Sequence, residues 1–355
     1  MHILQHFSPP SHSRPIFSSN VLRSIPRALL DNRALADLIM LFGRRRDYNK
    51  GNLGLFTLPM PEPEWETKHG KPTLDVIAVH GLNGDCFRSW THQDESQAGV
   101  KTTWLNELLP YQLPNARVMT FGYSANVLGN TSITGIRENA RMLLNCLRDR
   151  REDDGDSRHP IIFLGHSLGG IIIKQALRFA NNEPRYGDIA ESTRGVVFFG
   201  TPHRGADAAT WGNLVAGIMA TAFGTRIKTS FLKVLKPNSP DLMDLSEDFR
   251  SIATRYSIAS FVEEDKHSKL GRVIVGRHSA VMEVPHEEVA SLPGDHSSIC
   301  KFGRNDTRRF DAVWRCIRRI AQGTHTTAPP SGTLEIREIC IIATQDSRRL
   351  GKEIP

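Results

Sequence analysis

One short segment constrains this chain more than any other: a buried-strand pattern runs straight into a serine flanked by glycines. Residues 161–164 are Ile-Ile-Phe-Leu, Gly165-His-Ser-Leu-Gly-Gly170 follows without a gap, and an apolar helical pattern then continues to about Ala180. A strand that turns at once into a helix brings two backbones close, and glycines two residues before and after the serine remove the Cβ atoms that would collide. Such a turn leaves the hydroxyl of Ser167 exposed, which predicts a nucleophile. It also places the Leu168 N–H at the start of a helix, where it can donate to a developing oxyanion.

Alternating strand and helix patterns surround this turn. Continuous apolar runs predict buried strands over 74–79, 116–121, 161–164, 194–199 and 256–262, with one more over 272–275. Helical patterns cover 34–42, 104–109, 134–148, 168–180, 207–256 and 307–321, and the charged stretch 149–158 is expected to be a solvated loop. This alternation favours a mostly parallel sheet with helices on both faces. Together with the serine turn it predicts the α/β-hydrolase fold.

A second glycine-containing turn follows the first of these strands, in Val79-His-Gly-Leu-Asn-Gly84. Acyl transfer needs a second backbone donor for the oxyanion, and losing one such donor costs roughly 10²–10³ in rate. We assign that donor to the N–H of Leu82, with Gly81 permitting the close approach. His80 follows directly from a buried strand, so it is interpreted as ordering the loop rather than as a base.

The general base must be chosen from fourteen histidines. In this fold the chain order is nucleophile, acid, histidine, and that order leaves His267, His278, His286 and His296. His296, in Gly294-Asp-His-Ser-Ser-Ile299, lies on a short loop before the last predicted helix and is chosen as the base. His286 is interpreted as an exposed polar residue.

The acid is a choice among three neighbouring carboxylates at the end of a predicted strand, in Ala259-Ser-Phe-Val-Glu-Glu-Asp265. Glu263 directly ends the apolar run and is the first choice, while Glu264 and Asp265 stay open as alternatives. Asp295 is assigned to a turn because a residue adjacent to the histidine rarely orients toward its Nδ1.

The length of 355 residues fits a single domain with extensions. The predicted division is a variable leader over 1–50, a hydrolase domain over 51–322 and a linker-like tail over 323–355. The leader contains arginines and serines but no acidic residue before Asp31, as in a mitochondrial presequence, whereas its prolines favour a disordered extension. Both interpretations stay open.

Composition excludes several classes of protein. The net charge is +7, and the basic clusters are scattered, so no nucleic-acid surface is predicted. Five widely spaced cysteines without a C-x-x-C pair argue against a disulfide framework or a zinc site and favour a reducing, intracellular compartment. No metal or organic cofactor is required by the predicted chemistry. No run approaches the ~20 apolar residues of a transmembrane helix.

Five motifs, in this order, resemble a known family. They are Val79-His-Gly-Leu-Asn-Gly-Asp85, Trp90-Thr91, the serine turn, Phe199-Gly-Thr-Pro-His-Arg-Gly-Ala206 and Asp295-His-Ser-Ser-Ile-Cys-Lys-Phe302. Between about Gly51 and Ala321 the chain resembles the serine-active-site-containing (SERAC-type), lipase-like α/β hydrolases, which are distantly similar to GPI inositol-deacylases. In its organisation it resembles a stand-alone or truncated fungal-type member.

The resemblance implies a lipase or esterase activity on a carboxylic ester, with a lipid or lipid-like substrate. It implies Ser167, Glu263 and His296 as the triad, and Thr201 and His203 as part of the site wall. Some members of that family are linked to mitochondrial or endoplasmic-reticulum membranes, which implies peripheral membrane association, and a cytoplasmic location stays open as the alternative. Apolar residues between 211 and 231 are candidates for a lid.

Two other functions remain open at this point. A hydrolase-like fold can serve as a weakly active or inactive module for signalling or recruitment. A phospholipid-remodelling acyltransferase would use the same three residues, because a triad does not distinguish water from an alcohol as the acyl acceptor. The oligomeric state does not follow from the sequence.

Overall fold

The computed structural model describes residues 52–82, 84–94, 99–124, 133–155, 158–203, 248–268 and 270–323. The predicted leader, the predicted lid over 211–231 and nearly all of the predicted tail lie outside these residues. So do the expected helix over 34–42 and most of the helical stretch 207–256, of which 248–253 is described and is helical. The predicted domain boundaries therefore stay predictions.

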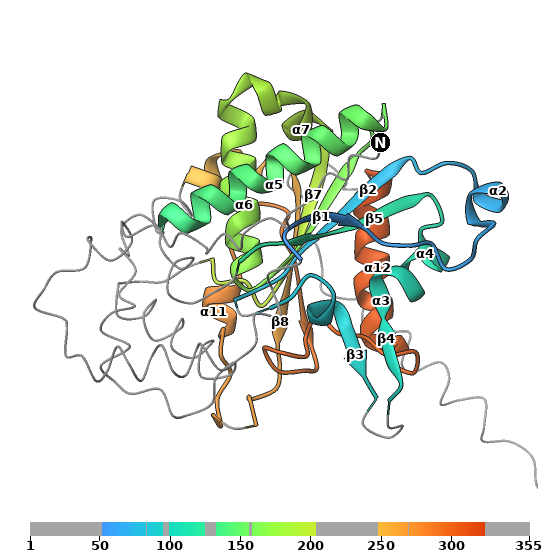
Figure 1. Cartoon of the computed structure of the whole chain (residues 1–355). Helices are drawn as coiled ribbons and strands as arrows, with labels where there is room; N and C mark the ends of the chain where they lie inside the picture. Colours follow the sequence, from blue (N-terminus) through green and yellow to red (C-terminus); the bar gives the residue numbers. More distant parts are fainter. Residues whose placement is uncertain are drawn as a thin grey trace, which may run out of the picture. The chain divides into compact units, whose positions relative to one another are not determined.

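The described part of the chain is built around a central sheet (Figure 1). Within that part it has seven strands, in the order β1-β5-β2-β6-β7-β8-β9. Their bounds are β1 Gly54–Thr57, β2 Leu74–Val79, β5 Ala116–Gly122, β6 Ile161–His166, β7 Thr193–Phe199, β8 Ser257–Glu263 and β9 Glu288–Leu292. β1 pairs antiparallel with β5, and every other pairing in this sheet is parallel.

The strand order changes direction at β2, which pairs with β5 on one side and β6 on the other. In open parallel sheets, ligands bind outside the carboxyl ends of the strands at such a switch point. Val79 is paired with Gly165, and His166 with Phe199. The ends of β2, β6 and β7 therefore lie at the same level, and the serine turn lies at that edge.

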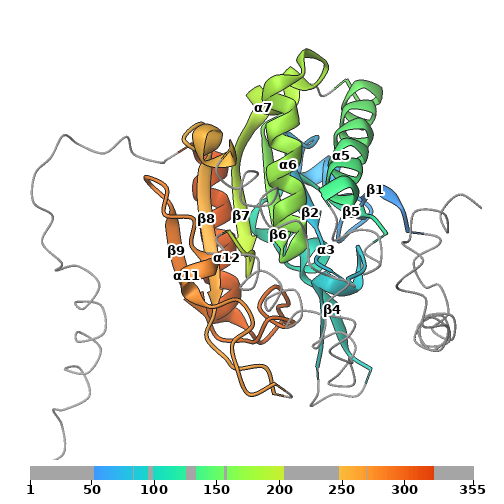
Figure 2. The same ribbon diagram turned by 90° about the vertical axis from the view of Figure 1, so that its left-hand side faces the viewer.

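Helices cover both faces of the sheet (Figure 2). One face carries α5 Ile133–Asp153, α6 Leu168–Asn182 and α7 Gly187–Ser192. The other carries α3 Trp104–Glu107, α4 Leu109–Gln112 and α12 Thr307–Gln322. Short elements complete the description: α2 Trp65–His69, η3 Arg88–Trp90, η4 Pro184–Tyr186, α11 Arg277–Ala280 and a hairpin of β3 Thr91–Gln93 with β4 Lys101–Thr103. None of the described helices is long and apolar enough to cross a membrane.

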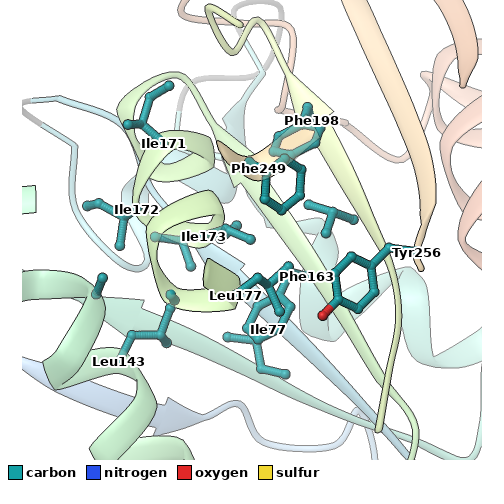
Figure 3. Close-up of a cluster of buried hydrophobic side chains, with 14 of the residues drawn as sticks. Ile77, Leu143, Phe163, Ile171, Ile172, Ile173, Leu177, Phe198, Phe249 and Tyr256 are labelled. Carbon is teal, nitrogen blue, oxygen red and sulfur yellow. The ribbon is translucent and has the colours of Figure 1, made fainter. Parts of the chain in front are cut away.

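Each face of the sheet has its own apolar core. Under α6, the side chains of Ile171, Ile173 and Leu177 pack near Phe163 of β6 and Phe198 of β7 (Figure 3). The opposite core joins alternate residues of the same strands to the aromatic rings of α3 and α12. A strand buried on both faces reads as a continuous apolar run, which is why the sequence located β2, β5, β6, β7 and β8. The mostly parallel sheet, covered on both faces, with a serine turn after β6, confirms the predicted α/β-hydrolase fold.

One predicted strand is wrong, and one strand of the sheet was not predicted. Residues 272–275 do not form a strand; the N–H groups of Ile274 and Val275 instead donate to the carboxylate of Glu263. The strand beside β8 is β9, which the sequence analysis missed because only its last residue, Leu292, is buried and the strand carries no apolar run.

The stretch 149–158 is not wholly a loop, because α5 continues to Asp153. The Arg151 side chain, only 2% exposed, crosses to Asp75 at the start of β2, with Nη1 2.5 Å from Oδ2. Arg117 of β5 donates to the other carboxylate oxygen of Asp75 at 2.8 Å. A buried ion pair therefore extends the helix where the charge pattern predicted solvent exposure.

Candidate active site

The backbone of Ser167 is strained in the way that the serine turn requires. Its φ is 52° and its ψ is −122°, a conformation that non-glycine residues rarely adopt. The N–H of Ser167 donates to the carbonyl of Phe199 at 3.0 Å, which ties the turn to the neighbouring strand. Leu168 then begins α6, so its N–H belongs to the first turn of that helix.

Close approaches of backbone or buried side-chain atoms explain the three glycines around the serine. A Cβ on Gly165 would lie 2.7 Å from the Cα of Gly170, and a Cβ on Gly170 would lie 2.2 Å from Oγ1 of Thr201. A Cβ on Gly169 would lie 2.1 Å from the carbonyl oxygen of Val79. Real Cβ atoms do not approach so closely, so each of the three positions requires glycine. The serine turn is thereby packed against both β2 and the segment after β7.

Ser167, His296 and Glu263 form one hydrogen-bonded row. Nδ1 of His296 lies 2.8 Å from Oε1 of Glu263, and Nε2 lies 3.0 Å from Oγ of Ser167. A carboxylate only accepts, so Nδ1 carries the hydrogen, which leaves the Nε2 lone pair to accept the serine hydroxyl. All three residues are buried, and Ser167 is only 1% exposed, so the prediction that the turn exposes its hydroxyl is wrong. In this geometry the imidazole can take the serine proton while the carboxylate stabilises the cation that results.

The structure separates the three carboxylates that the sequence left as alternatives. Glu263 is 4% exposed and also accepts the N–H groups of Val275 at 2.9 Å and Ile274 at 3.1 Å. Glu264 is exposed. Asp265 accepts the N–H of Gly294 at 2.7 Å, so it supports the loop before His296 without reaching the ring.

The loop after β2 lies against the serine. A Cβ on Gly81 would be 2.8 Å from Cβ of Ser167, so this glycine permits the approach that the sequence analysis assigned to it. His80 stacks on Tyr123 at 4.3 Å, and the Tyr123 hydroxyl donates to the His80 carbonyl at 2.8 Å. Burial lowers the pKa of His80 to about 4, so its ring is neutral and orders this loop. Leu82, which follows Gly81 in this loop, is partly exposed.

The other candidates lie outside the row. Asp295 accepts the N–H groups of Ser297 and Ser298 and so forms the predicted turn. His278 and His286 are exposed. His267 lies 3.9 Å from a carboxylate oxygen of Asp295.

The segment after β7 forms part of the wall beside the row. The Thr201 hydroxyl donates to the carbonyl of Gly165 at 3.3 Å, and the His203 ring meets Phe198 edge-on. Gly200, with a φ of 50°, passes so close that a Cβ there would lie 3.2 Å from Nδ1 of His296. Sequence reasoning did not single out Gly200, although its position directly after a predicted strand was a signal.

A protein-family model matches part of this chain, including the nucleophile segment but neither Glu263 nor His296. Residues 71–231 match a family model described as "Putative serine esterase (DUF676)". The matched residues include the loop after β2, the serine turn and β7. The similarity supports an ester hydrolase.

Curated relatives carry the name Protein SERAC1. The zebrafish (Danio rerio) protein is 28% identical over 268 residues, which are 70% of this chain and 39% of the relative. The human protein is 24% identical over 316 residues, 82% of this chain and 45% of the relative. The chain thus spans less than half the length of these relatives. They support the SERAC-type resemblance, whereas the fungal-type assignment stays a prediction.

Solved structures of similar fold include esterases and lipases. A thermostable carboxyl esterase from Bacillus coagulans, in complex with glycerol, has a TM-score of 0.42 at 16% identity and covers 76% of this chain and 99% of its own. A soluble variant of monoglyceride lipase from Saccharomyces cerevisiae has a TM-score of 0.42 at 12% identity, over 77% of this chain and 92% of its own.

Proposed function

We propose that this protein is a serine hydrolase that cleaves carboxylic esters through an acyl-enzyme intermediate. The observation that carries the proposal is the hydrogen-bonded row in which His296 contacts Ser167 at 3.0 Å and Glu263 at 2.8 Å. The strained backbone of Ser167 and the similarity to a serine esterase family model support the same function. A row of this kind, at the carboxyl ends of parallel strands, is the arrangement that nucleophilic acyl transfer uses.

In the first step Nε2 of His296 removes the hydroxyl proton as Oγ of Ser167 bonds to the ester carbonyl carbon. The resulting imidazolium donates its Nδ1–H to Glu263 and returns the Nε2 proton to the leaving alkoxide, which departs as an alcohol. Water, deprotonated by the same nitrogen, then attacks the carbonyl carbon of the acyl-serine. The bond from that carbon to Oγ breaks, Nε2 returns the proton to Oγ of Ser167, and a carboxylic acid leaves. Apart from water, these steps need no oxidant, metal or other co-reactant.

For the oxyanion of each tetrahedral intermediate we propose two backbone donors, the N–H groups of Leu82 and Leu168. The close approach of Gly81 to Ser167 and the helix that begins at Leu168 support this assignment. Helix N-termini favour negative charge, so the α6 end adds to the stabilisation.

For the substrate class we propose an ester with a lipid or lipid-like acyl chain. The five motifs that resemble lipase-like hydrolases support this choice. Peripheral membrane association and a mitochondrial, endoplasmic-reticulum or cytoplasmic location remain predictions from the same resemblance.

The test combines a fluorophosphonate probe with hydrolysis of p-nitrophenyl esters whose acyl chains range from two to sixteen carbons. We expect wild type to label and to turn over, with the highest kcat/KM for longer chains. Ser167→Ala should lose labelling and at least about 10³ of the rate. Ser251→Ala is the matched control, because this exposed serine on a helix donates its hydroxyl to the carbonyl of Asp248, a local bond outside the serine row.

Each alternative function has its own outcome. Equal labelling of wild type and Ser167→Ala contradicts the proposed nucleophile. Labelling of wild type without measurable turnover favours the signalling module. Preferential transfer of the acyl group to an added alcohol, seen as a new ester in place of the free acid, favours the acyltransferase.

A further inference from the structure

His166 lies between Gly165 and Ser167, and the mechanism above does not use its side chain. Its Nε2 lies 2.8 Å from the carbonyl oxygen of His296. A carbonyl only accepts, so this nitrogen carries the hydrogen. Burial lowers the pKa of His166 to about 3, with the neighbouring His296 ring adding to the effect, so the imidazole is neutral. A neutral imidazole has one N–H, and here it is used on the backbone of the base.

Two consecutive residues therefore hold His296 from two sides. Ser167 meets the ring at Nε2, and His166 meets the main chain of the same residue at its carbonyl. Other described contacts hold the flanks of this loop: Gly294 donates to Asp265, and the carbonyl of Ser298 accepts from Arg309. Position 296 itself, however, is fixed to the serine turn by the His166 bond.

The opposite edge of the His166 ring faces the loop after β2. Nδ1 of His166 would lie 2.9 Å from a Cβ on Gly81. The ring thus lies between the two loops that carry the proposed base and the proposed oxyanion donor. Its neutrality suits this place, since the two imidazole centres are 5.1 Å apart and a second cation would oppose the His296 imidazolium. His80 and Lys301 are the other titratable groups that act on His166, and both disfavour its charged form.

We propose that His166 is a positioning residue: its Nε2–H holds the backbone of His296 so that the ring stays in line between Ser167 and Glu263. The inference rests on the proposed hydrolase function and adds a residue to that site. Misplacing a reacting group by about 1 Å can cost roughly 10²-fold in rate. Loss of this bond should therefore slow the chemical step and leave substrate binding nearly unchanged.

Three substitutions test the bond. The glutamine amide reaches about as far as Nε2 of histidine and can donate to the His296 carbonyl, whereas the asparagine amide is one carbon shorter. We expect His166→Gln to keep kcat on p-nitrophenyl butyrate within about 5-fold of wild type. His166→Asn and His166→Leu should lower kcat, and the rate of fluorophosphonate labelling, roughly 10- to 100-fold, with KM changed less than about 3-fold.

A second histidine serves as the control. His69 makes the same kind of bond, from Nδ1 to the carbonyl of Trp65 at 3.1 Å, on the short helix α2 before β2. His69→Leu should leave kcat within about 2-fold of wild type, because a lost bond of this kind matters to rate only where it positions a reacting group. Thermal unfolding of every variant shows whether the protein is folded.

The Gln–Asn pair keeps the test decisive even where His166→Leu does not fold. Equal kcat values for His166→Gln and His166→Asn overturn the inference, as does a loss confined to KM. A wild type that neither labels nor hydrolyses the ester overturns the proposed function itself, and the positioning role with it. A wild type that is active beside an equally active His166→Leu overturns the positioning role alone.

Discussion

The three adjacent carboxylates at the end of β8 show how single residues acquire different roles. Glu263 accepts two backbone N–H groups and the Nδ1–H of His296, so three hydrogen bonds hold its carboxylate in place. Asp265 accepts one N–H, from Gly294, and Glu264 is exposed. Strand alternation and the position of the strand end explain the difference, because they decide which carboxylate meets the loop of residues 274–275.

At this scale we predict that Glu263→Gln lowers kcat roughly 10³- to 10⁴-fold, as for other triads whose acid is replaced by its amide. The amide is neutral, so it cannot accept the Nδ1–H of His296 and at the same time stabilise the positive charge of an imidazolium. Asp265→Asn and Glu264→Gln are the matched controls and should retain activity within about 5-fold, measured on the same p-nitrophenyl ester. A larger loss in Asp265→Asn than in Glu263→Gln would contradict the assignment of the acid.

Among the elements, α5 and β2 are joined by a buried ion network at the edge of the sheet away from the serine turn. Asp75 is fully buried and accepts Arg151 on one oxygen and Arg117 on the other. Arg117 also reaches Asp154 at 2.5 Å. Breaking a buried pair leaves an incompletely compensated charge, which costs far more than the loss of a surface pair.

We therefore expect Arg151→Met to lower the free energy of unfolding by about 3 kcal/mol, the lower end for a broken buried pair, since Arg117 still serves Asp75. Arg148→Met on the same helix removes pairs with Asp149 and Glu152, whose side chains are 63% and 65% exposed, and should cost less than about 1 kcal/mol. Urea unfolding of the two variants measures the difference. Equal costs would show that burial of the Asp75 pair carries no weight.

These elements also mark where sequence reasoning succeeded and where it failed. Strands buried on both faces carry their evidence in their own residues, so β2, β5, β6, β7 and β8 were found within one or two residues. The strand predicted at 272–275 and the loop predicted at 149–158 failed for one reason. Each depends on a partner distant in the chain, Glu263 in the first case and Asp75 in the second. The apolar and charged pattern of the segment itself does not reveal that partner.

At the scale of the whole molecule, one of the helices that cover the sheet contains a buried amine. Lys174 of α6 is 1% exposed, and burial lowers its pKa to about 7 even though Glu287, just before β9, favours its charge. Glu287 in turn accepts the hydroxyl of Ser260 at 2.6 Å and the N–H of Met282 at 3.0 Å. The unfolded chain retains the ordinary lysine pKa of 10.5.

This difference predicts how stability depends on pH. Between about pH 7 and 10.5 the unfolded state binds more protons at Lys174 than the folded state, so its contribution to the free energy of unfolding rises with pH. Below pH 7 the lysine is charged in both states, and the folded state bears the full cost of burial. Lys174→Met should therefore stabilise the protein at pH 6 more than at pH 9.5, because Glu287 keeps its other donors.

Urea unfolding of wild type and Lys174→Met at pH 6, 8 and 9.5 checks this prediction. The difference between the two proteins isolates the lysine from other groups that titrate over this range. We expect that difference to shrink steadily as the pH rises. A difference that is constant with pH would mean that Lys174 keeps its ordinary pKa in the folded state.

By itself, the sequence determined most of the strand and helix pattern, the serine turn and the chain order that left four histidines, among which the short loop before the last helix favoured His296. These properties lie in contiguous residues, where glycine spacing and apolar runs express the local backbone geometry. Only the tertiary structure distinguished Glu263 from its two neighbours, placed Gly200 beside the base and brought His166 to the carbonyl of His296. Those contacts join residues from different strand ends, and only the sheet brings the ends together.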